Sequence, residues 1–240
     1  MATKILRINS ELKKLFPKSK IALNYGNNWE LMVAVILSAQ CTDKKVNQVT
    51  PALFKKYPAV ADYAKANLEE FQKDIKSIGL FRAKAKNILE SAKTLVAKHN
   101  GEMPKTMEEM LELNGIGRKS ANIILWNAYG IITGVPVDTH VIRLSNLFGL
   151  IPTSSNSKNK SRGSSILQSK IGTKQKNPEK IEKDLMEILP KKEWSQFPYR
   201  LIDYGRKYCT ARCKHLECPL KWAIGPSELG HSEKKVRYRN

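Results

Sequence analysis

The sequence predicts an all-α fold. Apolar residues recur every three or four positions along most of its 240 residues, and no stretch alternates apolar with polar residues as a half-buried strand does. The stretch from Trp29 to Ala39 (WELMVAVILSA) is apolar on nearly every side, which is typical of a helix at the centre of a core. A chain of this length can bury a full core, as one domain or as two small ones.

The other helices follow from apolar stripes and from the residues at their ends. In chain order, helices are expected within residues 5–15, 68–78, 85–96, 106–114, 118–129, 139–148, 178–189 and 195–208. Gly79 is expected to cap the helix of residues 68–78 at its C-terminus. Thr106 with Glu109 forms a capping-box pair, and Asn177 followed by Pro178 is a typical helix start.

The chain is strongly basic. Its 42 lysines and arginines against 22 aspartates and glutamates give a formal net charge of +20. Such an excess favours a polyanionic partner, with nucleic acid first and an anionic membrane surface second. No stretch reaches the roughly 18 apolar residues of a spanning helix, and the N-terminus lacks the apolar centre of a signal peptide. We therefore expect a soluble protein with no membrane partner, located in the cytoplasm, and nucleoid-associated if the source is a prokaryote.

Two segments are too polar to bury much surface. Residues 153–177 contain six basic residues, no acidic ones and few large apolar side chains, so they are expected to form a flexible basic insertion. The polar residues 225–240 are expected to form a mobile tail.

The stretch LNGIGRKSANIIL, Leu113 to Leu125, predicts a turn followed by an apolar helix. Gly115 and Gly117 allow a tight and partly left-handed backbone path, and the amides at the helix start can hold a phosphate without reading sequence. Arg118 and Lys119 follow directly. A plain interhelical turn is the alternative reading of the glycines, and from composition alone Lys119 is a phosphate contact.

Asp138, in the stretch GVPVDTH, stands immediately before the next apolar helix. It is expected to cap that helix by accepting backbone amides. A carboxylate held in this way stays ionised, so it can also stabilise positive charge that develops beside it.

Residues 113–143, together with LSAQCTDKKVN at 37–47, resemble the endonuclease III family of DNA base-excision glycosylases, within the helix-hairpin-helix and Gly/Pro-Asp superfamily. The resemblance covers about 24–150 and 178–210. It implies two helical domains that flank a DNA-binding active-site cleft. Residues 24–133 would form a barrel-like domain that ends in the hairpin, and 1–23 with 134–224 would form the second.

The same resemblance implies an activity. Lys119 matches the family's nucleophilic lysine and Asp138 its essential aspartate, on opposite sides of the cleft. The expected enzyme removes oxidised pyrimidines from damaged double-stranded DNA and cleaves the abasic site by β-elimination through a Schiff base. It is expected to act as a monomer. The alternatives are a glycosylase of other base specificity and a non-catalytic hairpin module that binds DNA.

The resemblance implies further residues that contact DNA. Gln40 matches the residue inserted into the gap left by a flipped base, with a polar helix-end residue as the alternative. Leu80 and Phe81 lie where the family places an intercalating loop, although Phe81 could equally belong to the core. Asp43 would be a helix cap near the site. His140 would orient the pocket, or make only a structural hydrogen bond.

Three of the four cysteines, Cys209, Cys213 and Cys218, lie close together, and in a reducing compartment such a group suggests a metal more than disulfides. Many family members hold a [4Fe-4S] cluster there with cysteines spaced C-x6-C-x2-C-x5-C, and Cys41 should be too far away to take part. This chain departs from that pattern, because no cysteine follows Cys218 and His215 stands where the second cysteine is expected. An iron-sulfur cluster, another metal in a Cys3His site within 209–218 and a metal-free loop remain alternatives. None is required for the chemistry.

Overall fold

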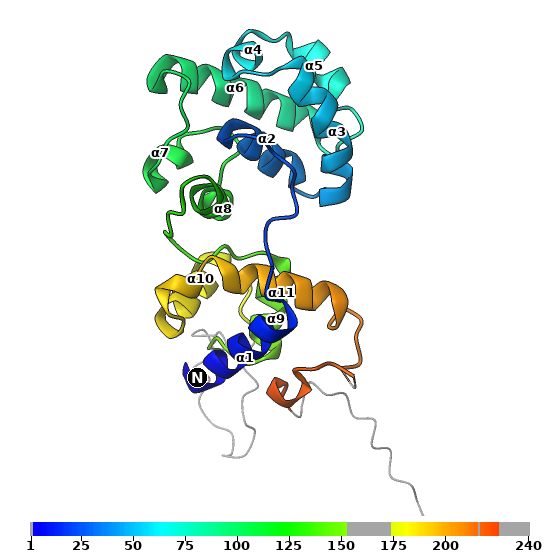
Figure 1. Ribbon diagram of the computed structural model, residues 1–240, viewed down its shortest axis with the longest axis vertical. Coiled ribbons are helices and arrows are strands. Elements are labelled where there is room, and N and C mark those ends of the chain that lie inside the picture. Colours follow the sequence, from blue (N-terminus) through cyan, green and yellow to red (C-terminus); the bar gives the residue numbers. More distant parts are fainter. Residues whose placement is uncertain (1, 153–173, 216, 226–240) are drawn as a thin grey trace, which may run out of the picture. The chain divides into compact units, whose positions relative to one another are not determined.

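The structure, a computed structural model, describes residues 2–152, 174–215 and 217–225, and every regular element in these ranges is a helix (Figure 1). The predicted all-α class is confirmed for them. The chain divides into two compact units. Lys20–Pro136 forms what we call the middle unit, and Met1–Ser19 with Val137–Asn240 forms the terminal unit. None of the helices in the described ranges is long and apolar enough to cross a membrane.

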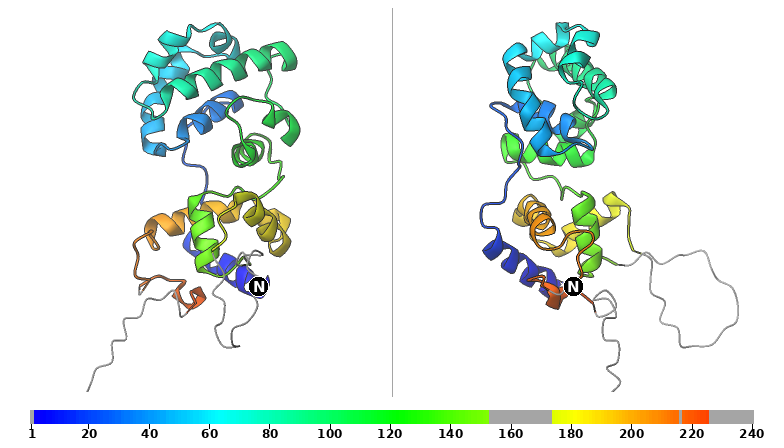
Figure 2. Two further views of the ribbon diagram at one scale, coloured as in Figure 1. Left: turned by 180° about the vertical axis from the view of Figure 1, so that it is seen from behind. Right: turned by 90° about the vertical axis from the view of Figure 1, so that its right-hand side faces the viewer.

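The middle unit is built around α2 (Asn28–Ser38), whose side chains from Leu31 to Leu37 are all buried. Its long helix α6 (Phe81–His99) packs against α4 (Val60–Lys65), α5 (Leu68–Asp74) and α2, as the views of Figure 2 also show. The remaining helices of this unit are α3 (Asp43–Lys56), α7 (Met107–Leu111) and α8 (Arg118–Tyr129), of which α3 and α8 pack on α2. The core helix expected at Trp29 to Ala39 is therefore confirmed, because α2 is the element that α3, α6 and α8 share.

The terminal unit joins the two ends of the chain. Its helices are α1 (Ala2–Leu15), α9 (Thr139–Leu147), α10 (Pro178–Ile188) and α11 (Gln196–Lys207), with short turns η1 (Lys191–Glu193) and η2 (Lys221–Ala223). α11 packs against both α1 and α9. Buried Glu193 connects the sequence ends, because its carboxylate accepts from Lys13 at 2.5 Å and from Arg200 at 2.9 Å.

Two expectations about segment ends are wrong. α5 ends at Asp74, and its C-cap is Ile75, so Gly79 does not cap it. Ile75 and Ile78 are both buried, so the apolar spacing continues through the turn after the helix has ended. The second error concerns Asp43, which is the first residue of α3. Thr42 is the N-cap, since its hydroxyl accepts from the Lys45 amide at 3.2 Å.

The predicted bounds of the insertion, residues 153–177, extend too far at the C-terminal end. Gln175 is buried, its amide donates to Asn146 Oδ1 at 2.9 Å, and its carbonyl accepts from Asn146 Nδ2 at 2.8 Å. Residues 174–177 therefore belong to the folded unit, and Asn177 caps α10 as predicted. The composition of a segment is an average, so it cannot reveal that a single residue such as Gln175 is buried and hydrogen-bonded to Asn146. The rest of the predicted insertion, and the predicted tail beyond Gly225, lie outside the described residues.

Candidate active site and nucleic-acid interface

The predicted turn connects α7 to α8 and is fixed to α6. Gly115 has a φ of +80°, and a Cβ at this position would stand 2.8 Å from Asn87 Nδ2. The Asn114 carbonyl accepts from Ser91 Oγ at 3.0 Å, and Ile116 is buried. Gly115 is therefore required both by the backbone conformation and by its close approach to α6.

Gly117 has a different role. It is the N-cap of α8 with φ −99° and ψ 174°, which any residue can adopt, so the left-handed part of the predicted turn lies at Gly115. No heavy atom of the described residues lies within 4 Å of the place where its Cβ would stand. As a glycine, it has no side chain with which to cap α8. The dipole of the 12-residue helix favours an anion at this end, toward which the first backbone amides point.

Lys119 lies in the first turn of this helix. Its side chain is exposed, as is that of Arg118, and the first turn of α8 contains no acidic residue. The amine is therefore open to an incoming group at the same helix end that can hold a phosphate.

Asp138 is the N-cap of α9, as predicted. Its Oδ1 accepts from the Val141 amide at 2.8 Å, and the residue is half-buried. It belongs to the terminal unit, two residues after the boundary at Pro136, whereas Lys119 belongs to the middle unit. The hydrogen bond to the Val141 amide fixes the position of this carboxylate at the start of α9.

His140 lies in the first turn of α9 and packs against α11. A Cβ on Gly205 of α11 would stand 2.6 Å from His140 Nδ1 and 3.1 Å from Arg143 Nη2. The glycine therefore makes room for both side chains.

Gln40 and Leu80 have a shared, unusual backbone conformation. Both are exposed non-glycine residues with positive φ, 52° for Gln40 and 58° for Leu80, and Leu80 is 58 % exposed. Gly79 lies beside the first loop, with its Cβ position 3.7 Å from the Gln40 carbonyl oxygen. Strained residues of this kind persist where the surrounding structure fixes them, and they are frequent at ligand-binding sites. Phe81, by contrast, is half-buried against the core.

Lys84 connects these two loops, and sequence reasoning missed it. Its side chain is buried, and Nζ donates to the carbonyl oxygens of Leu37 at 2.8 Å and Ala39 at 2.6 Å. Burial lowers the pKa of this amine. Lys84 thereby ties the start of α6, which follows Leu80, to the end of α2, which leads into Gln40. Nothing in the sequence distinguishes it from the other basic residues.

The four donors predicted in 209–218 come together. Cys209, Cys213, His215 and Cys218 each offer a ligand atom, and these atoms all lie within 4.8 Å of one another. Burial raises the pKa of the Cys209 thiol and that of Cys218, the latter to about 12, because a thiolate is poorly solvated there. A bound cation reverses that preference. The group is thus compatible with a metal centre, while Cys41 lies in the other unit.

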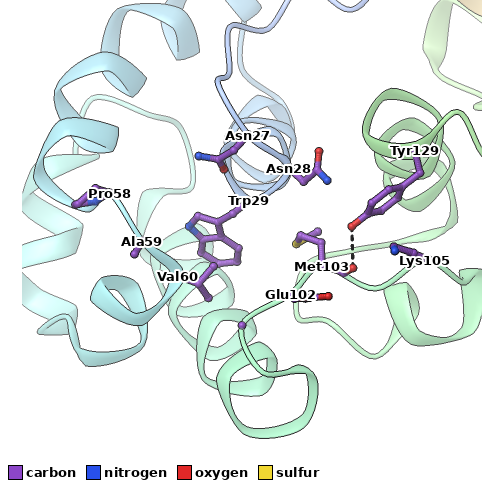
Figure 3. A pocket seen from close by; sticks show the side chains of 11 residues that line it. Asn27, Asn28, Trp29, Pro58, Ala59, Val60, Glu102, Met103, Lys105 and Tyr129 are labelled. Atoms are coloured by element: carbon purple, nitrogen blue, oxygen red, sulfur yellow. Dashed lines mark hydrogen bonds between the residues drawn. The ribbon is translucent and has the colours of Figure 1, made fainter.

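A large pocket of the middle unit lies elsewhere. It has a volume of about 450 Å³ and is lined by residues such as Asn27, Trp29 and Tyr129 (Figure 3). The Tyr129 hydroxyl donates to the Met103 carbonyl at 2.8 Å beside it. This pocket is not lined by the hairpin, nor by Gln40, Leu80 or Lys119. It is therefore separate from these residues, which are predicted to act on DNA.

Comparisons with known proteins agree with this geometry. The family model of the HhH-GPD superfamily, described as base excision DNA repair proteins, matches residues 33–169. Endonuclease III of Synechocystis is 44 % identical over 211 residues, covering 88 % of this chain and 85 % of that protein. Endonuclease III of Bacillus subtilis is 42 % identical over 209 residues, covering 86 % and 84 %.

Solved structures of endonuclease III with DNA are also similar to this chain. A non-covalent endonuclease III–DNA complex superposes with a TM-score of 0.81 at 38 % identity, over 93 % of this chain and 95 % of that one. A trapped endonuclease III–DNA covalent intermediate gives 0.79 at 38 % identity, over 92 % and 93 %. These matches, together with the helical fold and the hairpin, show that this chain is a member of the helix-hairpin-helix class of base-excision DNA repair proteins. Within that class, the chain belongs to the endonuclease III family.

Proposed function

We propose that this protein is a bifunctional DNA glycosylase and abasic-site lyase that repairs oxidised pyrimidines, with Lys119 as its nucleophile. The observation that carries the proposal is the position of Lys119, an exposed amine in the first turn of a helix that begins directly after the glycine turn. Both the phosphate-binding element and the reactive amine therefore come from one short stretch of sequence. Family membership supports the same activity.

The chemistry follows from the residue types. The neutral Lys119 amine attacks C1′ of the damaged nucleotide, and the base leaves with the bonding electrons and takes up a proton. The C1′–O4′ bond then breaks as the nitrogen lone pair forms the Schiff base, and the proton lost from the amine is taken up by the ring oxygen O4′. Loss of a C2′ proton then expels the 3′ phosphate by β-elimination. The Asp138 carboxylate, held at the N-terminus of α9, offsets the positive charge that develops at C1′ as the base departs. No cofactor takes part in these steps.

DNA must be distorted before the amine can reach C1′, because the glycosidic carbon is shielded inside the base stack. Gln40 fills the gap left by the extruded nucleotide, and its amide pairs with the edge of the orphaned base. Leu80, largely exposed, enters the stack as an apolar wedge. Gly115, Gly117 and Arg118 hold the backbone phosphates, and His140 supports the site from α9.

The partner is thus duplex DNA with a damaged base or an abasic site, bound by one copy of the chain. The net charge of +20 favours such a partner through release of counterions. A cytoplasmic location, close to the nucleoid in a prokaryote, agrees with this substrate.

The test separates base release from strand cleavage. Lys119→Gln should lose both on a thymine-glycol duplex, while Lys93→Gln, which removes a charge from an exposed lysine of α6, should keep both. Asp138→Asn preserves the capping acceptor but not the charge, so it should fold normally and lose most of its turnover. Wild-type activity in Lys119→Gln would contradict the assignment and leave a DNA-binding module with another nucleophile or none.

A further inference from the structure

We propose that Cys209, Cys213, His215 and Cys218 hold one tetrahedral zinc ion, in place of the multi-iron cluster that the family resemblance implies. This metal centre would be a structural one in the terminal unit. It goes beyond the proposed repair chemistry and does not depend on it.

The four donor atoms have the spacing of ligands that share a single metal ion. Cys213 Sγ lies 3.3 Å from Cys218 Sγ, and His215 Nδ1 lies 3.4 Å from Cys209 Sγ and 3.9 Å from Cys218 Sγ. All four donors are within 4.8 Å of one another. Ligands that share one zinc ion at Zn–S of about 2.3 Å are separated by about 3.8 Å in a tetrahedron. The observed distances match that size.

An iron-sulfur cube has a different requirement. Its four ligands bind four separate iron atoms at alternate corners, so the ligand atoms must surround a body of eight atoms and stand farther apart. The donor set differs as well, since three thiols and one imidazole form a common structural zinc site. The chain replaces one expected cysteine by His215 and supplies Cys213 between Cys209 and His215. Because Cys213 takes the place of a cysteine after Cys218, all four ligands lie within residues 209–218.

The surroundings suit a closed, anionic site. Cys209 is 0 % and Cys218 is 2 % exposed, which is typical of structural zinc and leaves little room for a substrate. Three thiolates and one zinc ion carry a net negative charge, and Arg143 offsets it, with Nη1 3.7 Å from Cys209 Sγ and Nη2 2.6 Å from the Cys209 carbonyl. The His215 amide donates to Cys213 Sγ at 3.2 Å. Such contacts orient and stabilise metal ligands.

The backbone at His215 agrees with a role as a ligand. This residue has a φ of +63°, a conformation that non-glycine residues adopt only where their surroundings enforce it. Its ring nitrogen Nδ1 lies close to the thiols of Cys209 and Cys218 in this conformation. Arg143 joins Cys209 to α9, the helix that Asp138 caps.

The experiment measures metal directly. The full-length protein is produced in medium that contains both iron and zinc, and it is purified without oxygen so that an iron-sulfur cluster would survive. Elemental analysis should find about one zinc per chain, with no iron and no acid-labile sulfide. Replacement by Co²⁺ should give the visible spectrum of a tetrahedral thiolate site. Chelation should release the ion and lower Tm.

Matched variants locate the ion. Cys213→Ser should lose zinc or bind it at least about 10-fold more weakly, while Cys41→Ser, which changes the cysteine of the middle unit, should keep it in full. His215→Cys should keep the zinc, because a fourth thiolate is an equally good ligand. Any of three results would overturn the proposal. These are several irons with labile sulfide, no metal with Tm insensitive to chelator, or unchanged zinc affinity in Cys213→Ser.

Discussion

Gly115 and Gly117 stand two residues apart in the hairpin, yet different constraints act on them. Gly115 has the left-handed backbone and closely approaches Asn87 of α6, whereas Gly117 has an ordinary backbone and faces open space. The fold therefore requires a glycine at position 115, whatever Gly115 contributes to binding. The fold places no such demand on Gly117, so we expect a side chain at this position to affect the proposed phosphate contact more than stability.

This difference predicts opposite effects for the same substitution. Gly115→Ala should lower the free energy of unfolding by about 1–3 kcal/mol, because it forces a strained φ and displaces Asn87. Gly117→Ala should cost under about 1 kcal/mol of stability, but weaken binding to undamaged duplex DNA. Urea unfolding and fluorescence anisotropy measure the two quantities. Equal DNA affinity for Gly117→Ala and wild type would remove the phosphate contact from this turn.

At this scale the sequence predicts local contacts, such as helix caps, better than contacts between distant residues. The capping role of Asp138 follows from one local pattern and is confirmed. Lys84 and Ser91 could not be found in that way, because their partners lie 47 and 23 residues away along the chain. Long-range packing, which no local spacing encodes, brings them together.

At the scale of elements, the start of α6 and the end of α2 form one supporting frame. Lys84 caps the C-terminal carbonyls of α2 from inside α6, and on either side of it Gln40 and Leu80 are held in strained conformations. The two residues proposed to enter DNA thus depend on one buried amine for their relative position. The orphan carbonyls at a helix end require such donors.

Lys84→Met should therefore affect both stability and DNA opening. Loss of two buried hydrogen bonds should cost roughly 2–4 kcal/mol in urea unfolding. Turnover on a thymine-glycol duplex should fall by more than the loss of folded protein explains. The double variant Lys84→Met with Gln40→Ala should have nearly the same turnover as Lys84→Met alone. Lys93→Met, the same change at an exposed position of α6, is the control. Fully additive losses in the double variant would contradict a role through Gln40.

The helices themselves were predictable to different degrees. α8 has the predicted bounds, because a glycine turn and an apolar stripe define it. α3 was not predicted beyond its expected start, and it contains Pro51 in its interior, which local rules assign to a helix break. The tertiary packing of α3 on α2 outweighs that local preference.

At the scale of the whole molecule, the terminal unit depends on an ion-pair network between α1, η1 and α11. Burial alone would raise the pKa of Glu193, but hydrogen bonds with Lys13, Asn9 and Arg200 together hold that pKa at about 2. The ordinary pKa of a glutamate is about 4.3. Because the folded-state pKa is depressed, this stabilisation is present above about pH 4.3 and is lost as the pH falls toward about 2.

Acid should therefore destabilise the wild type more than a variant without this carboxylate. Between about pH 5 and about pH 2, wild type should lose about 2 kcal/mol more unfolding free energy than Glu193→Gln. At neutral pH the variant should be the less stable protein, because Arg200 is left buried beside a neutral amide. Chemical denaturation across this pH range measures both effects, and parallel pH profiles would contradict the network.

The charge of the molecule gives a prediction about DNA affinity. Four basic residues, Lys158, Lys160, Arg162 and Lys170, lie in the part of the predicted insertion outside the described residues. Changing all four to Gln should weaken DNA binding and reduce the slope of log K against log salt by about 0.9 for each phosphate that is no longer neutralised. Single-turnover rates at saturation should not change. An unchanged slope would exclude this segment from binding DNA.

The central claim is that Lys119 forms the covalent bond to DNA, and borohydride reduction tests it most directly. The enzyme is mixed with a duplex that carries an abasic site, reduced, digested and analysed by peptide mass spectrometry. We expect a sugar fragment on Lys119 and on no other lysine, and no adduct in Lys119→Gln. A fragment on another amine, or an equal yield from the variant, would contradict it.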